Sequence, residues 1–248
     1  MSFPNIIFGG DGDQFRVYAP AAALQGGPSV GQQMVFDDGR KFRYASAGAV
    51  ALAVANLEQA PIPVANHVLQ TAAAAAVGAT SVALTLGATA ATANQYHNGY
   101  LVVDLVTNTG FGYTYGIDHH PAVASAGVFT VPLKSTVQVA ISTAANSISL
   151  VPNTYQGVIL AVATNPTATI AGVSVKVIPI GDFGWVQTRG ACMCLTTGTL
   201  VIGEKVFAST TTGAVIAESA FSVEQTVGFV LRVATTTDYS TIDIRIDG

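Results

Sequence analysis

The chain has 248 residues, of which 50% are hydrophobic and only 10% are charged, and its formal net charge is −4 at pH 7. An ordinary soluble domain carries about 25% charged residues, and a disordered chain combines low hydrophobicity with high net charge, so this composition excludes disorder. The sequence has no continuous apolar stretch of about 20 residues for a membrane helix, and its scattered Lys and Arg residues form no basic stripe for phosphates. We therefore expect a folded protein that binds neither membrane nor nucleic acid.

The N-terminal segment, residues 1 to 28, is rich in Gly, Pro and Ala. It contains two groups of chain breakers, Gly9-Gly10-Asp11-Gly12 and Gly26-Gly27-Pro28. This pattern predicts an extended arm, which becomes ordered only by lying on its own domain or on a neighbouring subunit. The segment from Met1 to Phe15 lacks the basic and apolar stretches of a secretion signal, so we expect synthesis in the cytoplasm.

A hairpin is predicted between Gln33 and Tyr44. The dipeptide Asp38-Gly39 is one of the strongest short-range hairpin signals, and alternating segments flank it on both sides. Charged side chains at the tip of a hairpin are usually solvated rather than functional. We interpret four residues in this way: Asp37, Asp38, Arg40 and Arg43.

The segment that follows, Ala47 to Leu57, is ambiguous because its alanines favour a helix and its valines favour a strand. We expect an irregular turn followed by a short helix.

Charge almost disappears between Gln59 and Ile180, where the formally charged residues are Asp104, Asp118, Lys134 and Lys176. A surface with so little charge tends to associate, so we expect assembly to cover it. Repeated alternating segments separated by turn signals predict an antiparallel β-sandwich or β-barrel. The predicted strands are Ser81 to Leu86, Gly99 to Val106, Phe111 to Ile117, Val128 to Leu133, Thr136 to Ile141 and Gly157 to Ala163.

The stretch from Gly181 to Gly213 holds the single tryptophan and both cysteines, with glycines at regular intervals. The glycines predict tight turns between short strands, and Trp185 is expected to be buried. Cys192 and Cys194 lie two residues apart on a predicted strand and point to the same face, which is poor geometry for a mutual disulfide. We interpret them as small buried hydrophobic residues.

Three further strands are predicted in the last part of the chain, at Ala214 to Ile216, Thr226 to Val233 and Thr241 to Ile246. In the last of these, Ile242, Ile244 and Ile246 alternate with charged residues, which predicts one buried face and one solvated face.

The segment Tyr113 to Pro121 is the most enzyme-like part of the sequence, because Asp118 precedes the adjacent His119 and His120. Neighbouring strand residues point to opposite faces, so these two histidines do not ligate one ion from a regular strand. His67 and His97 are isolated in sequence. With no nucleotide-binding, hydrolase or zinc-protease motif, we expect no catalytic residue, metal or cofactor, and hence a protein that is not an enzyme.

Several blocks of the chain resemble virion structural proteins of tailed bacteriophages, in particular the small proteins that decorate or cement the capsid exterior. These blocks are FDDGRKFRYASAGAVALAVANLEQA (Phe36 to Ala60), the two segments within Ala93 to His120, ISLVPNTYQGV (Ile148 to Val158) and FGWVQTRG (Phe183 to Gly190). The glycine-punctuated C-terminal part is similar to the β-barrel module of such proteins. The resemblance implies a β-rich homotrimer on the virion surface, at the symmetry axes of a shell of major capsid protein, made in the host cytoplasm and without catalytic residues.

The expected organisation is therefore all-β, with two β domains and an extended N-terminal arm. Residues 1–58 (arm and hairpin) and 181–248 (a β-barrel) form a base domain, and residues 59–180 form a low-charge β domain. The expected function is to stabilise the capsid by bridging major capsid protein subunits. The alternative is a head-fibre or tail-associated binding module whose aromatic residues stack on a sugar. That set comprises Tyr96, Tyr100, Phe111, Tyr113 and Tyr115, beside Asn94, Asn98 and Asp118.

Overall fold

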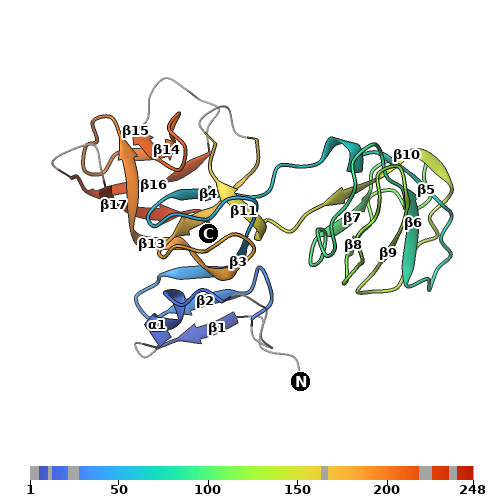
Figure 1. The fold of residues 1–248 in the computed structure, drawn as a ribbon, viewed down its shortest axis with the longest axis horizontal. Helices are drawn as coiled ribbons and strands as arrows, with labels where there is room; N and C mark the ends of the chain where they lie inside the picture. The colour runs from blue at the N-terminus through green and yellow to red at the C-terminus, as the bar shows by residue number, and fades with distance from the viewer. Residues whose placement is uncertain are drawn as a thin grey trace. The chain divides into compact units, whose positions relative to one another are not determined.

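The structure is a computed structural model that describes residues 6–10, 13–21, 28–162, 167–217, 225–234 and 239–247. In the described part of the chain 46% of the residues are in strands and 3% in helices, so the predicted all-β fold class is confirmed (Figure 1). Within those ranges, no helix has the length and apolar character needed to cross a membrane.

The elements follow one another as β1 (Ile6–Gly9), α1 (Gln14–Val17), β2 (Gln33–Phe36), β3 (Lys41–Ala47), β4 (Leu57–Gln59), the 3-10 helix η2 (Ala65–His67), β5 (Gln70–Ala72), β6 (Ser81–Thr85), β7 (Tyr100–Val103), β8 (Thr114–Gly116), β9 (Val128–Pro132), β10 (Ala144–Val151), β11 (Gln156–Leu160), β12 (Ile170–Ser174), β13 (Phe183–Thr197), β14 (Lys205–Ala208), β15 (Val215–Ala217), β16 (Thr226–Arg232) and β17 (Tyr239–Arg245).

The chain divides into two compact units. Unit 1 comprises Met1–Pro61 and Thr154–Gly248, and unit 2 comprises Ile62–Asn153. The predicted boundary at Ile180 therefore needs correction, because the segment from Thr154 to Ile180 belongs to unit 1. Its strands β11 and β12 pair with β3, β4 and β13, all of which are strands of unit 1.

Unit 1 contains two closed rings of strands that share β13. The first ring runs β3, β11, β4, β12 and β13, and it closes because β13 also pairs with β3. The second ring runs β13, β15, β14, β16 and β17, and it closes because β17 pairs back with β13. Most pairings are antiparallel, but β1 with β2, β3 with β11, and β13 with β15 are parallel (Figure 1). Closure leaves neither ring with an open edge, which protects small sheets from edge-to-edge association.

The shared strand β13 corrects one sequence prediction, since it continues through Gly184 and Gly190 instead of turning at each glycine. Gly190 has φ +89°, a left-handed conformation that glycine adopts without strain. The register of β13 against β3 also shifts between Gln187 and Arg189. The strand therefore bends where it leaves the first ring and enters the second.

The predicted hairpin forms from β2 and β3, with Gly39 at φ +84° in its turn. Beyond it, β1 pairs with β2 and α1 lies near β13, and Ala21 forms a bridge with Phe183. The described parts of the N-terminal arm therefore lie on their own unit. The arm's residues 1–5, 11–12 and 22–27 lie outside the described residues.

The short helix predicted within Ala47 to Leu57 does not form. Strand β3 extends to Ala47, and the chain then turns back through a bridge between Leu52 and Ile178 before β4 begins. Leu52 and Leu57 are both completely buried. Their burial in unit 1 outweighs the modest helix propensity of the intervening alanines.

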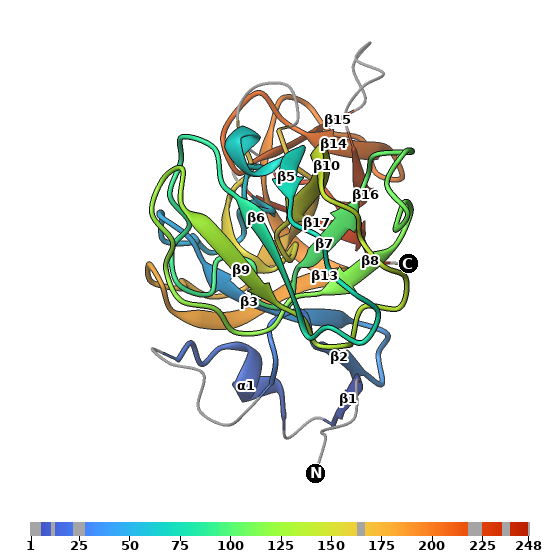
Figure 2. The ribbon, with the colours of Figure 1, turned by 90° about the vertical axis from the view of Figure 1, so that its right-hand side faces the viewer.

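Unit 2 is built on one curled sheet with the strand order β8, β7, β10, β5, β6, β9 (Figure 2). The segments that follow its two edge strands meet in a bridge between Ile117 and Leu133, which draws the edges together. The strand predicted from Thr136 to Ile141 is absent, although Ile141 forms an isolated bridge with Ala75. The buried core of unit 2 includes Tyr96, Leu101, Ile117, Phe129 and Ile148.

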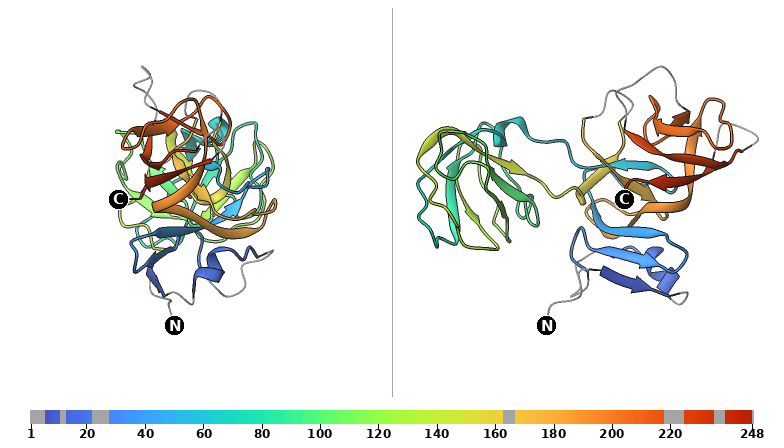
Figure 3. Two further views of the ribbon diagram at one scale, coloured as in Figure 1. Left: turned by 90° about the vertical axis from the view of Figure 1, so that its left-hand side faces the viewer. Right: turned by 180° about the vertical axis from the view of Figure 1, so that it is seen from behind.

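Unit 2 is inserted between two neighbouring strands of unit 1, and Figures 1 and 3 show the two connections. Strand β4 leads into the insert and β11 leads out of it, and these strands pair antiparallel through Gln59 and Ile159. Within unit 2, β5 and β10 near its two ends are also antiparallel neighbours. Entry and exit are therefore close together in each unit, as is usual for an inserted domain.

Candidate functional site

The main polar cluster of unit 2 lies at the seam where its sheet closes. Two backbone hydrogen bonds join the seam: the Asp118 N–H donates to Pro132 O at 2.9 Å, and the Lys134 N–H donates to Gly116 O at 2.9 Å. The turn that carries His97 is attached to the same place, because the Asn98 N–H donates to Ile117 O at 3.0 Å. We call His97, Asp118 and His119 the seam cluster.

Within the seam cluster, the rings of His97 and His119 stack with centroids 3.7 Å apart and planes inclined by 21°. One ligand atom from each imidazole and one from the Asp118 carboxylate all lie within 4.8 Å of one another, the one such group found in the described part of the chain. Asp118 and His119 are exposed, and His97 is half-buried. His97, although isolated in sequence, therefore has His119 and Asp118 as close neighbours in the fold.

The backbone of the seam cluster is held by two asparagines with left-handed conformations, Asn94 at φ 59° and Asn98 at φ 62°. Asparagine tolerates this region better than most residues. The Asn94 side-chain oxygen accepts the His120 backbone N–H at 3.0 Å, and it lies 3.3 Å from His119 Nδ1. The turn at residues 94–98 and the segment at residues 117–120 are thus cross-linked.

The two adjacent histidines point apart, as the sequence analysis predicted. His120 is buried, its Nε2 accepts the Tyr96 backbone N–H at 3.0 Å, and burial lowers its pKa. His67 is also buried, and its Nε2 lies 2.9 Å from the carbonyl oxygen of Thr89. These two histidines are satisfied core residues, whereas His119 faces solvent.

The environment of His97 favours its neutral form. Burial, reinforced by the neighbouring His119 and Lys134, lowers the pKa of His97 from 6.5 to about 4. The Lys134 ammonium donates a hydrogen bond to the Asn98 side-chain oxygen beside this ring. At neutral pH, His97 therefore presents an uncharged imidazole with a lone pair.

The aromatic set considered for sugar binding does not form one platform. Tyr96 and Tyr115 are buried in the core of unit 2, whereas Tyr100, Phe111 and Tyr113 are 41–50% exposed. A ring stacks on a sugar only through an accessible face, so the two buried tyrosines are unavailable for this purpose.

The outward face of β5, β6 and β9 carries no charged side chain within these three described strands. Thr71, Thr85 and Val128 form one row across the strands, and Val128 is 69% exposed. Ala83 pairs with Thr130 in the next row. We call these five residues the neutral face. It is uncharged and includes residues of the edge strand β9.

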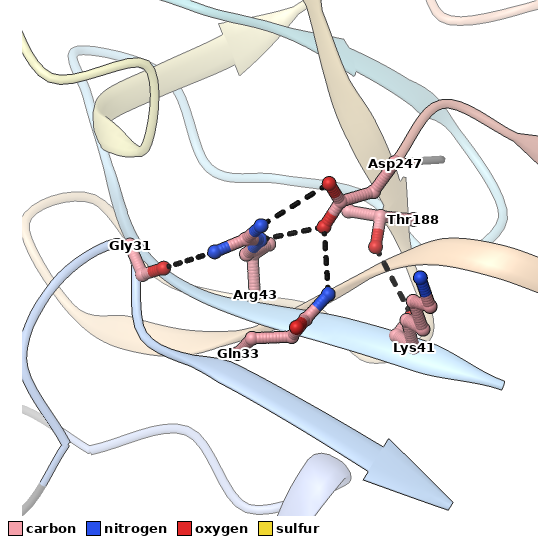
Figure 4. A network of polar contacts seen from close by, with 6 residues as sticks. All are labelled: Gly31, Gln33, Lys41, Arg43, Thr188 and Asp247. Atoms are coloured by element: carbon pink, nitrogen blue, oxygen red, sulfur yellow. Dashed lines mark hydrogen bonds and ion pairs between the residues drawn. The ribbon is translucent and has the colours of Figure 1, made fainter. Parts of the chain in front are cut away.

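One ion pair of unit 1, between Arg43 and Asp247, joins residues far apart in the sequence (Figure 4). The Asp247 carboxylate accepts hydrogen bonds from Arg43 Nε at 2.6 Å and from Gln33 Nε2 at 3.1 Å, and Arg43 Nη1 donates to Gly31 O at 2.9 Å. The hydrogen bond with Asp247 raises the pKa of Arg43. Arg43 is thus a partly buried ion-pair partner, which corrects its interpretation as a solvated hairpin charge.

Both cysteines are buried and free, which confirms the interpretation from their spacing. The contact with the Cys192 thiol, together with burial, raises the pKa of the Cys194 thiol well above its ordinary value. A protonated thiol is a poor nucleophile and a poor metal ligand. The pair therefore contributes packing to the second ring, where Cys194 is completely buried.

Glu58 is a buried acid with no partner for either carboxylate oxygen. It lies on β4 opposite Gly172 of β12, and burial raises its pKa well above the ordinary value of 4.5. The nearby Ser174 hydroxyl partly offsets this rise, although the two groups do not reach hydrogen-bonding geometry. Burial therefore keeps the Glu58 carboxyl protonated to higher pH than an exposed glutamate.

No protein-family model, curated protein or solved structure matches this chain. The chain is therefore described by its fold and composition alone. It is an all-β protein with a double-ring unit and an inserted β unit of very low charge.

Proposed function

We propose that this chain is a non-enzymatic structural protein of a bacteriophage virion, which decorates the outside of the capsid and stabilises it by bridging subunits of the major capsid protein. The observation that carries the proposal is the scarcity of charge in unit 2, whose charged residues are Asp104, Asp118 and Lys134. The sequence blocks that resemble capsid decoration proteins support the same function.

The three charged side chains of unit 2 leave the neutral face free of charge. Asp104 accepts a hydrogen bond from the Ser149 hydroxyl, Lys134 donates to Asn98, and Asp118 belongs to the seam cluster. Charge keeps protein surfaces apart, so a face without it favours burial in an assembly. A protein that acts by covering and joining subunits needs this kind of surface more than it needs a catalytic pocket.

Binding to the shell is tested by cosedimentation of the full chain with empty capsids of a tailed phage whose genome encodes it. We expect saturable binding at a fixed ratio to the major capsid protein and increased resistance of the bound capsids to heat. A parallel glycan-array measurement addresses the alternative of a head-fibre or tail-associated binding module. Sugar binding without capsid binding would favour that alternative and remove the decoration proposal.

Self-assembly is a separate expected outcome: a homotrimer with three times the chain mass of 25.3 kDa. An obligate interface buries about 2,000 Å² or more, and a closed three-membered ring matches a three-fold or quasi-three-fold axis of an icosahedral shell. Because the neutral face offers no ion pairs, the trimer should survive both dilution to micromolar concentration and high salt.

Multi-angle light scattering at low and high salt measures this state, and a matched pair of variants locates the interface. Val128→Glu places a charge on the neutral face and should shift the protein towards monomer. Val201→Glu is the control, because Val201 is similarly exposed, at 63% against 69% for Val128, but lies in unit 1. A wild-type monomer of 25.3 kDa in both buffers would contradict the assembly argument.

A further inference from the structure

We propose that the seam cluster of His97, Asp118 and His119 is a binding site for a divalent transition-metal ion of the zinc type. The inference is independent of the proposed function, since it concerns a site that capsid decoration does not require. It rests on the convergence of the three ligand atoms within 4.8 Å of one another.

The donor set selects the class of ion. Two imidazole nitrogens and one carboxylate oxygen suit Zn²⁺ and its neighbours Co²⁺ and Ni²⁺, whereas Mg²⁺ and Ca²⁺ prefer oxygen ligands alone. With Zn–N distances of about 2.0 Å, tetrahedral ligand atoms lie about 3.3 Å apart. The three donors, which lie within 4.8 Å of one another, therefore need to close by at most about 1.5 Å. Rotation of exposed side chains supplies a movement of that size.

The orientation of the rings determines what has to move. An imidazole binds a metal in its own plane, but the rings of His97 and His119 are stacked at 3.7 Å with an angle of 21°. Binding therefore turns one ring out of the stack so that the two lone pairs converge. His119 is the exposed member of the pair, whereas His97 is half-buried, so His119 is the ring that turns.

Three neighbouring side chains, Asn94, Asn98 and Lys134, affect how the seam cluster binds a metal ion. The Asn94 oxygen lies 3.3 Å from His119 Nδ1 in the stacked arrangement. After the ring turns, a hydrogen bond from the ring nitrogen that does not bind the ion to this oxygen would give the usual arrangement around metal-bound histidine. The contact between the Asn98 amide nitrogen and His97 Nδ1 is long, at 3.4 Å, so little is lost when an ion replaces it. Lys134 beside Asn98 opposes a cation and limits the affinity.

Isothermal titration of the full-length, chelator-treated protein with ZnCl₂ tests the site, and the visible absorption of added Co²⁺ gives an independent readout. We expect one ion per chain. His97→Gln, Asp118→Asn and His119→Gln should each weaken binding at least about tenfold, since even outer partners of metal ligands cost about 10–100-fold when changed. Lys134→Gln should tighten binding, because it removes the opposing charge.

Asp118→Asn is the decisive variant, because Asp118 is exposed and asparagine keeps the side-chain oxygen that accepts the His119 backbone N–H at 2.8 Å. Its fold is checked by far-UV circular dichroism. Asp37→Asn removes the same charge from the exposed hairpin turn of unit 1 and should leave zinc binding unchanged. Absence of saturable Zn²⁺ binding, or binding that all three cluster variants leave intact, would overturn the proposal.

Discussion

Replacing Trp185 by alanine is expected to lower the free energy of unfolding of unit 1 by about 3–5 kcal/mol, the usual cost of emptying a large aromatic site. Trp185 is only 5% exposed, which agrees with the burial predicted from sequence. Its ring packs edge-on against Tyr44, with centroids 5.1 Å apart, in a cluster with Met34, Phe36 and Phe42. The cavity would open between β13 and the hairpin, where Trp185 pairs with Tyr44 of β3, so the first ring would lose support.

Urea unfolding followed by far-UV circular dichroism measures this loss without relying on the removed fluorophore. Trp185→Phe should retain most of the stability because it keeps an aromatic ring in the site. Leu231→Ala is the surface control, since Leu231 is 49% exposed and should change stability by no more than about 0.5 kcal/mol. A wild-type tryptophan emission maximum typical of full exposure to water would contradict the packing described above.

Replacing Glu58 by glutamine is expected to stabilise the protein at neutral and alkaline pH, because glutamine fills the buried position without an ionisation penalty. Each pKa unit by which the folded state exceeds the unfolded state is worth about 1.4 kcal/mol of stability. Burial raises the folded-state pKa of Glu58 above 4.5, the ordinary value that applies in the unfolded chain. Below that value both states are protonated and the carboxyl carries no ionisation penalty. As pH rises towards and through the folded-state pKa, the unfolded state loses its proton first, so stability falls.

Thermal unfolding of wild type and Glu58→Gln across a pH series measures the difference. The two proteins should converge at acidic pH and separate as pH rises, because glutamine does not ionise. Glu204→Gln is the matched control, since its side chain makes an exposed hydrogen bond to the Val201 N–H and its loss of charge should have little effect. Equal stability of wild type and Glu58→Gln at every pH would refute the interpretation.

The elements predicted well from sequence are those set by neighbouring residues. The hairpin turn at Asp38-Gly39 and the strands β6, β9 and β17 follow from local alternation and turn chemistry, which the structure retains. The all-β class followed from the same signals repeated along the chain.

The features missed from sequence depend on distant contacts. Gly190 looked like a turn, but the pairing of β13 with both β3 and β17 carries the strand through it. The boundary of the insert was misplaced because Thr154 to Ile180 has as little charge as unit 2, although its strands pair within unit 1. His97 meets His119 only because the curled sheet of unit 2 brings two separate loops to one seam.

The paired strands β4 and β11 form a junction at which the inserted unit 2 could be exchanged for another domain. The main chain leaves and re-enters unit 1 on adjacent antiparallel strands, whose register is set by Gln59 and Ile159. An inserted domain whose own termini lie close together meets the geometric requirement of this junction. Replacement of the insert by another domain with neighbouring termini is therefore expected to leave the double ring folded, which far-UV circular dichroism of such a chimaera would measure.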